Sequence, residues 1–268
     1  MSEYDIYQVD AFAGAVFAGN PAAVVPMADW APDAVLQNIA SENNLAETAF
    51  FTATDAPERY RLRWFTPAQE VPLCGHATLA SAHVLFKHLG FTGPEIVFET
   101  LGGDLTVKKS ASGGYEMDFP ADPPTPTVAP EGLADALGAA PSAVFRAQYL
   151  MAVYPDAAAV KALRPDLTKL EALADGRLTD CVIATAPGEG DADFVSRFFA
   201  PSQGIPEDPV TGSAHCVLAP YWADKLGKRQ LVGFQASKRG GRVACRLAGD
   251  RVMLSGDAVT YLRGRIFV

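Results

Sequence analysis

The stretch that decides the fold occurs twice, as RWFTPAQEVP at residues 63–72 and as RFFAPSQGIP at residues 197–206. Five of the ten positions are identical, at an offset of 134 residues. Downstream, residues 75–90 align with residues 212–227 at an offset of 137, so the second copy carries a three-residue insertion within residues 207–211. Because self-similarity at a nearly fixed offset is typical of a repeated structural unit, we expect a duplicated fold. The alternative is two unrelated α+β domains with coincidental similarity.

A proline-rich stretch, PADPPTPTVAP at residues 120–130, has the composition of a linker. It lies between the two copies of the repeat. We therefore place the first domain at residues 1–119 and the second at residues 120–255.

Short strands and one buried helix are predicted in each half. Residues 59–64 alternate arginine with Tyr60, Leu62 and Trp64, the pattern of a half-buried strand. Residues 76–89 are apolar on nearly every side, so a helix there must be buried all round, and residues 213–226 form its counterpart. The pattern predicts an α+β fold in which a sheet wraps around a central helix. Further short strands are predicted at residues 96–100, 105–109, 115–119, 243–247 and 252–255.

Composition and charge exclude several classes of protein. Of the 268 residues, 49% are hydrophobic and 20% are charged, which is typical of a globular chain. The formal charge of −9, without a basic run, argues against nucleic acid or an anionic membrane as a partner. No signal-peptide pattern and no long apolar run is present, and four cysteines without C-x-x-C spacing are too few for a disulfide framework. We expect a cytoplasmic protein that acts on a small molecule.

Both predicted buried helices begin at a glycine, Gly75 in the first half and Gly212 in the second, where Ser213 follows. A helix N-terminus offers unpaired N–H groups and partial positive charge, and so favours a carboxylate or a phosphate. If a pseudo-twofold axis relates the halves, both helix ends could point at one cleft and hold a small carboxylate or an amino-acid-like substrate. The alternative is that both glycines only permit close turns.

Three side chains are candidates for acid/base chemistry. Glu47 lies where a predicted helix ends and an apolar strand begins, and loss of water around it would favour the protonated form that a general acid needs. His76 lies in the first turn of a buried helix, where the helix dipole predicts a neutral ring. Asp208 lies in the segment of the second copy that holds the insertion, and therefore has no partner in the first copy. A capping or turn carboxylate and an ordinary buried histidine are the simpler explanations.

No cofactor or metal is predicted. The sequence has no zinc signature, Walker loop, dinucleotide fingerprint or nucleophile elbow, and His83, His88 and His215 have no spacing typical of metal ligands.

The chain resembles the PhzF family of phenazine biosynthesis-like isomerases, which have the diaminopimelate-epimerase-like fold. The matching segments run in order from the N-terminus to beyond residue 210. They are VDAF at 9–12, GNPAAVV at 19–25, NLAETAF at 44–50, WFTP at 64–67, LCGHATLA at 73–80 and EDPVTGSAH at 207–215.

The resemblance implies two β-barrel-like domains, each around a central helix, with residues 256–268 completing the first domain, the active site in the cleft between the domains, and a homodimer. The founding enzyme moves a hydrogen on a dihydro-hydroxyanthranilate without a cofactor. By the resemblance, Glu47 would shuttle the proton, His76 and Asp208 would bind and polarise the substrate, and Gly75, Gly212 and Ser213 would donate hydrogen bonds to it.

Two other functions remain open from the sequence. Cys74-Gly75-His76 also resembles the first cysteine motif of proline-type racemases, epimerases and dehydratases, although Thr211 stands where a second catalytic cysteine would be expected. The other is a binding protein that keeps the fold but has no turnover.

Overall fold

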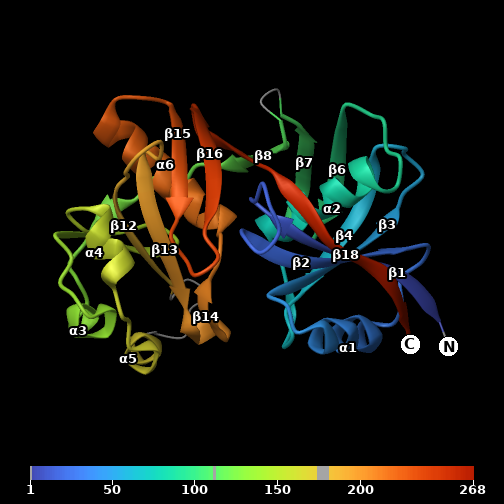
Figure 1. The fold of residues 1–268 in the computed structure, drawn as a ribbon, viewed down its shortest axis with the longest axis horizontal. Coiled ribbons are helices and arrows are strands. Elements are labelled where there is room, and N and C mark those ends of the chain that lie inside the picture. Colours follow the sequence, from blue (N-terminus) through green and yellow to red (C-terminus); the bar gives the residue numbers. More distant parts are fainter. Residues whose placement is uncertain (1, 111–112, 174–180) are drawn as a thin grey trace. The chain divides into compact units, whose positions relative to one another are not determined.

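The computed structural model describes residues 2–110, 113–173 and 181–268. The chain divides into two compact units, Met1–Asp118 with Ser255–Val268, and Phe119–Leu254 (Figure 1). The chain passes between the units in strands β8 (Tyr115–Pro120) and β17 (Arg251–Gly256). The other elements of the first unit are β1 (Glu3–Ala11), β2 (Asn20–Met27), α1 (Asp33–Asn43), β3 (Glu47–Ala53), β4 (Arg59–Phe65), β5 (Glu70–Val71), α2 (Gly75–Lys87), β6 (Glu95–Thr100), β7 (Gly103–Lys109) and β18 (Ala258–Phe267).

Among the described residues of the second unit, three α-helices are short and one is long, and they are joined by the unit's own strands. Its elements are β9 (Thr125–Pro126), α3 (Leu133–Leu137), β10 (Ala143–Arg146), β11 (Leu150–Val153), α4 (Ala157–Ala162), α5 (Leu167–Ala172), β12 (Val182–Pro187), β13 (Phe194–Ala200), the 3₁₀ turn η1 (Pro201–Gln203), β14 (Ile205–Asp208), α6 (Gly212–Leu226), β15 (Gln230–Gln235) and β16 (Gly241–Ala248).

The two units repeat one strand order. In the first, β2 is parallel to β3, β3 antiparallel to β4, β4 parallel to β6, and β6 antiparallel to β7. In the second, β11, β12, β13, β15 and β16 follow one another with the same alternation of parallel and antiparallel pairs. The long helix enters at the same point of both series, after the short strand β5 or β14. The predicted α+β duplication is therefore confirmed.

Helix α2 is the core of the first unit. Every residue from His76 to Leu85 is buried, and the helix packs against β1, β2, β3, β7 and β18 (Figure 1). Its buried hydroxyls are satisfied within the helix, since Thr78 donates to the carbonyl of Cys74 and Ser81 to that of Ala77. The predicted span of 76–89 is confirmed, although the regular helix ends at Lys87.

Helix α6 has the same place in the second unit. It is buried along most of its length and runs through Pro220 without ending. Trp222 on this helix packs parallel to Phe194 on β13 and donates its indole N–H to Thr185 on β12. The remaining helices supply a separate apolar layer. Leu133 of α3, Val160 of α4 and Leu170 of α5 cluster with Val182 and Phe199 of the sheet.

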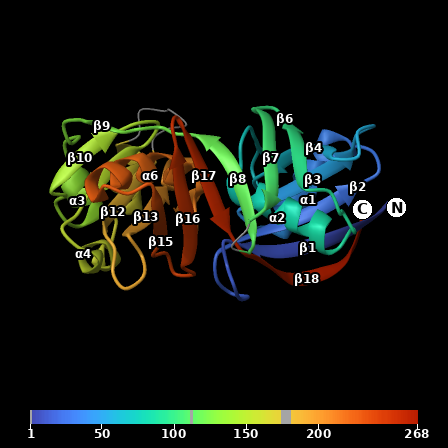
Figure 2. The same cartoon turned by 90° about the horizontal axis from the view of Figure 1, so that it is seen from above.

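The last strand returns to the first unit. Strand β18 pairs antiparallel with β1 from Glu3 opposite Phe267 to Ala11 opposite Ala258. Figure 2 shows β18 lying beside β1. The N-terminal strand therefore has a neighbour on each side, because β2 pairs with its other edge.

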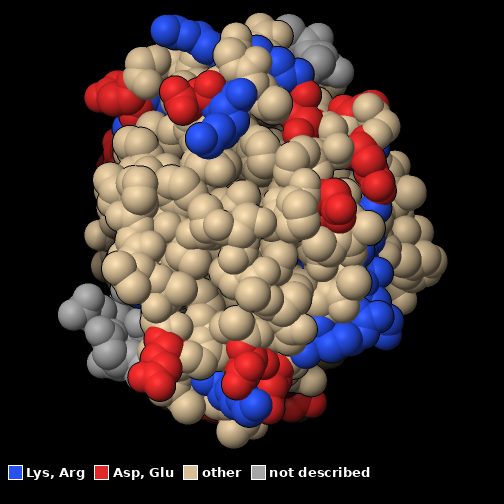
Figure 3. Space-filling model, turned by 90° about the vertical axis from the view of Figure 1, so that its left-hand side faces the viewer, with Lys and Arg blue, Asp and Glu red and all other residues tan. Residues whose placement is uncertain are grey.

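The charges on one face are mixed. On the face in Figure 3, lysine and arginine alternate with acidic residues around a broad uncharged centre, and basic groups do not gather into one patch. This face therefore lacks the electrostatic footprint of a nucleic-acid surface among the residues drawn in colour. Over the described parts of the chain, no helix combines the length and the apolar character that crossing a membrane requires.

A buried histidine links β18 to the central helix. His83 on α2 has Nδ1 3.0 Å from the Tyr115 hydroxyl and Nε2 2.9 Å from Oγ1 of Thr260. The Nε2 of His88 lies 2.7 Å from the same Thr260 oxygen. Burial, together with the nearby charges of His88 and Lys87, lowers the pKa of His83 to about 4.

We predict that the free energy of unfolding falls as the pH is lowered from 6.5 toward 4. Above 6.5 the His83 ring is neutral in both states, and between 6.5 and 4 the unfolded chain takes up a proton that the folded chain does not. One such histidine can contribute a slope of up to about 1.4 kcal/mol per pH unit. His83→Gln, which keeps hydrogen-bonding groups but does not titrate, should flatten the slope measured by urea unfolding. An unchanged slope in His83→Gln would contradict this assignment.

Candidate active site

Two neighbouring elements of the first unit bring Glu47 and His76 together. Helix α1 is followed by the C-cap Asn44, whose left-handed backbone conformation (φ 48°) redirects the chain, and β3 begins three residues later at Glu47. Cys74, in extended conformation, is the N-cap of α2, and His76 is the second residue of that helix. The helix start is thus packed against the start of a buried strand.

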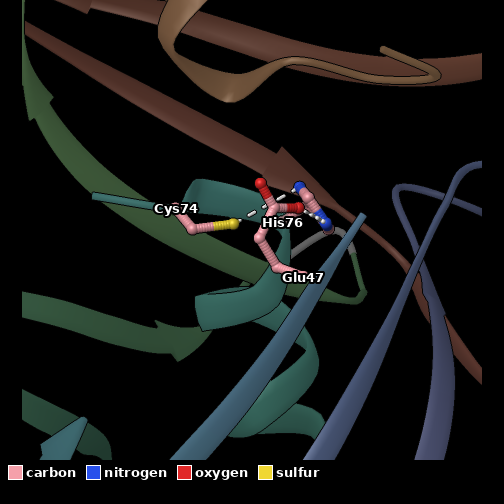
Figure 4. A group of neighbouring side chains, drawn as sticks. All are labelled: Glu47, Cys74 and His76. Carbon is pink, nitrogen blue, oxygen red and sulfur yellow. Dashed lines mark hydrogen bonds and ion pairs between the residues drawn. The ribbon is translucent and has the colours of Figure 1, made fainter. Parts of the chain in front are cut away.

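The three side chains form one buried cluster (Figure 4). Nε2 of His76 lies 3.1 Å from Oε2 of Glu47, within ion-pair distance but without the alignment of an N–H···O hydrogen bond. On the other side of the ring, Nδ1 lies 3.6 Å from Sγ of Cys74. Exposed fractions are 9% for Glu47, 6% for Cys74 and 4% for His76. Charges in such a place are weakly screened, so the state of each group depends on its neighbours.

Asn20, the first residue of β2, completes the surroundings of the ring. Its side-chain Nδ2 lies 3.1 Å from Nδ1 of His76. The amide can donate to an unprotonated Nδ1 or, after a half-turn, accept from a protonated one. Asn20 therefore suits both protonation states of His76. The sequence analysis did not single it out, although an asparagine directly before an apolar strand was a signal for a buried polar partner.

His76 favours the charged form. Burial alone would lower the pKa of His76, but the contacts of its ring with Cys74 and Glu47 raise that pKa well above the ordinary value of 6.5. Burial, reinforced by the charge of Glu47, raises the pKa of the Cys74 thiol to about 11, so the sulfur is neutral near pH 7. Glu47 is therefore the charge that sustains the imidazolium near neutral pH. The expectation of a neutral ring is wrong, because it considered the helix dipole and not a carboxylate 3.1 Å away.

In the second unit, the segment before α6 holds Asp208 by a set of directed hydrogen bonds. The side-chain oxygen of Gln235 accepts from the backbone N–H of Thr211 at 2.9 Å, which fixes the orientation of the amide. Its Nε2 then donates to the carbonyl of Asp208 at 2.7 Å and to the Thr211 hydroxyl at 3.1 Å. Because that hydroxyl accepts a hydrogen bond from Gln235, its own hydrogen is free to point to Oδ2 of Asp208, to which it donates. Gln235 is fully buried and was not found from the sequence, since its partners lie 24 or more residues away.

The start of α6 carries a second polar pair. The hydroxyls of Ser213 and Tyr149 lie 2.9 Å apart, and burial raises the pKa of Tyr149 to about 12, so the phenol stays protonated. Gly212 is buried beside Ser213. The predicted site residues thus fall into two groups, Glu47, Gly75 and His76 in the first unit and Asp208, Gly212 and Ser213 in the second. Their joint action on one substrate stays a prediction.

The structure thus combines a duplicated α+β fold with a buried carboxylate and histidine at the start of the central helix of the first unit. The profile of the phenazine biosynthesis-like protein family (PhzC-PhzF) matches residues 9–264, and the chain belongs to that family.

Relatives and solved structures agree with this assignment. The chain is 47% identical over 266 residues to an uncharacterized isomerase of Pseudomonas aeruginosa, covering 98% of this chain and 99% of the relative. A crystal structure of a PhzF-family protein from Enterococcus faecalis matches with a TM-score of 0.94 at 42% identity, over the full length of both chains. A hydroxyproline epimerase from Agrobacterium vitis, at 11% identity and a TM-score of 0.59 over 98% of this chain and 92% of the epimerase, shares the fold alone.

We predict that Glu47→Gln lowers the pKa of His76 from above 6.5 to below it. The substitution removes the negative charge and leaves the burial, which by itself disfavours the imidazolium. Nitrogen-edited NMR titration of the four histidines can measure the shift, with His76→Gln to assign the signal. An unchanged His76 pKa in Glu47→Gln would refute the role given to this carboxylate.

Proposed function

We propose that the protein is a cofactor-independent isomerase that moves a proton between two carbon atoms of a small carboxylate. The observation that carries the proposal is the buried Glu47 carboxylate 3.1 Å from a histidine at the N-terminus of a buried helix. A proton-transfer enzyme needs an acid/base group beside a cationic group that stabilises the negative charge left on the substrate. The relatives named isomerases support this class of reaction.

The proposed reaction has two steps. Glu47 takes a proton from one carbon of the substrate, and the electron pair of that C–H bond is delocalised into the neighbouring π-system. The same carboxyl group then returns the proton to another carbon, so that substrate and product are isomers and Glu47 ends as it began. His76 stabilises the intermediate charge and remains protonated. The backbone N–H groups at Gly75 would bind the carboxylate of the substrate.

The second unit would contribute binding groups to the same reaction. Asp208, held by Thr211 and Gln235, offers a fixed carboxylate that suits an amino or hydroxyl group of a substrate. The backbone at Gly212 and the Ser213 hydroxyl suit an anionic or polar group. Together these groups favour an amino-acid-like substrate, a class that includes dihydroaromatic amino acids.

A solvent-exchange screen is the test of this function. Cyclic amino acids and dihydroaromatic acids are incubated with the protein in D₂O, and deuterium uptake at carbon is followed by proton NMR. The proposal expects uptake by at least one acid, without added metal or nicotinamide. Activity on a true substrate that depends on either addition would overturn it.

We predict that Glu47→Gln lowers the rate of exchange by about 10²- to 10⁴-fold, the usual contribution of a general acid/base group. Glutamine keeps the size and polarity of the side chain but cannot take up the proton. Glu42→Gln, an exposed carboxylate on α1, is the matched control and should keep the full rate. A near wild-type rate in Glu47→Gln would reject the assignment.

A second candidate is a cysteine-dependent epimerase with Cys74 as the base, because its sulfur lies 3.6 Å from Nδ1 of His76. Two observations weigh against it. The pKa of Cys74 is raised to about 11, so little thiolate is present near pH 7, and the corresponding residue before α6 is Thr211, whose hydrogen is directed to Asp208.

Cys74→Ala separates the two candidates. A glutamate base predicts that most of the exchange activity survives, whereas a thiol base predicts its loss. The measurement is the exchange rate of the variant at pH 7 and pH 9. A rate that disappears at both values would favour the thiol.

A further inference from the structure

Glu47, Cys74 and His76 present three kinds of metal ligand in one buried cluster. A carboxylate oxygen, a thiol sulfur and a ring nitrogen, one from each residue, all lie within 4.8 Å of one another. All three residues are buried, and Figure 4 shows their side chains side by side. Oε2 of Glu47 and Nε2 of His76 also have no hydrogen-bond partner of good geometry among the described residues. The cluster thus brings three possible metal-ligand atoms together, and two of its polar atoms have no well-aligned hydrogen bond.

The spacing of sulfur and nitrogen, here that of a thiol–imidazole hydrogen bond, also fits two ligands of one tetrahedral metal ion. With Zn–S of about 2.3 Å and Zn–N of about 2.05 Å, tetrahedral angles separate the two ligand atoms by about 3.6 Å. Sγ of Cys74 and Nδ1 of His76 are 3.6 Å apart. A carboxylate ligand of the same ion would lie about 3.4–3.6 Å from each. One ligand atom of each residue lies within 4.8 Å of the other two, so the Glu47 side chain must turn toward the ion to complete the set.

The donor set selects the kind of ion. Mg²⁺ and Ca²⁺ take oxygen ligands, whereas a thiolate with an imidazole favours Zn²⁺ or Co²⁺. Three protein ligands leave a fourth position of the tetrahedron for water. Asn20, whose Nδ2 lies 3.1 Å from Nδ1, must give up that contact when the nitrogen binds metal.

We propose that Cys74, His76 and Glu47 bind one Zn²⁺ ion per chain, and that the ion regulates the protein by inhibition. On binding, the thiol proton of Cys74 passes to solvent, as does the Nδ1 proton of His76 where that ring is charged. No oxidation or reduction takes place. The inhibitory part rests on the proposed function, because an ion that holds Glu47 and His76 removes both from proton transfer.

Cobalt binding to the full chain tests the site without an activity assay. The protein is treated with a chelator, desalted and titrated with Co²⁺ alone. We expect one equivalent to produce the visible bands of a tetrahedral ion and a near-ultraviolet thiolate-to-metal band, and Zn²⁺ to displace it. Cys74→Ser should abolish the thiolate band and weaken Zn²⁺ binding by at least the roughly 10- to 100-fold that loss of an outer-shell partner typically causes.

Cys245→Ala is the matched control, since it removes another buried thiol that lies outside the cluster, and it should bind as the wild type does. No cobalt spectrum, or an equal one in Cys74→Ser, would overturn the metal site and leave the proposed isomerase untouched. If Zn²⁺ binds and slows proton exchange until a chelator is added, both parts are supported. Binding with an undiminished exchange rate would keep the metal site and overturn its inhibitory role.

Discussion

Burial of a whole helix inside a sheet is the constraint on which each unit depends. Most of helix α2 has no solvent-exposed face, so strands must surround it. Its polar side chains therefore need hydrogen-bond partners within the protein. Along the helix these partners are local, as Thr78 and Ser81 bond to carbonyls one turn earlier. At the N-terminus the first backbone N–H groups have no carbonyl within the helix. The buried helix start is therefore the place where this fold leaves polar groups available.

The same constraint determines the charge of His76. A cation at a helix N-terminus opposes the helix dipole, at a cost of typically 0.3–1 kcal/mol, and burial disfavours it further. Glu47 can offset both effects because β3 begins beside the helix start, and its carboxylate lies 3.1 Å from the ring. The charged form of each side chain is thus stable only while the other, oppositely charged side chain is present. Removal of one partner leaves an uncompensated buried charge, which is the property that makes these two groups responsive to a proton or a cation.

The sequence predicted those features of the fold that follow from the order of apolar and polar residues along the chain. The repeat gave the duplication, and the apolar residues from Ala77 to Leu85 gave the buried helix, because neither inference needs a contact that is distant along the chain. Asn20 and Gln235 could not be found in this way, since each acts on a residue of another element 24 to 56 positions away. The charge of His76 was mistaken for the same reason. The helix dipole at His76 can be inferred from the predicted start of the helix. The Glu47 carboxylate that faces the ring cannot, because its position depends on where strand β3 lies in the fold.

The two copies of the repeat differ in the residues at the start of the long helix, where the candidate site residues of each unit lie. Cys74 and His76 in the first copy align with Thr211 and Ser213 in the second, and the second copy has three extra residues within 207–211, before α6. In the second unit, Gln235 fixes the Thr211 hydroxyl, which in turn fixes Asp208, so every hydrogen in that set has an assigned acceptor. In the first unit, Asn20 can face either protonation state of His76, and no directed hydrogen bond ties Glu47 to that ring. The Asp208 carboxylate of the second unit is thus held in one orientation, whereas the buried Glu47–His76 pair of the first unit is close but is not fixed by a directed hydrogen bond.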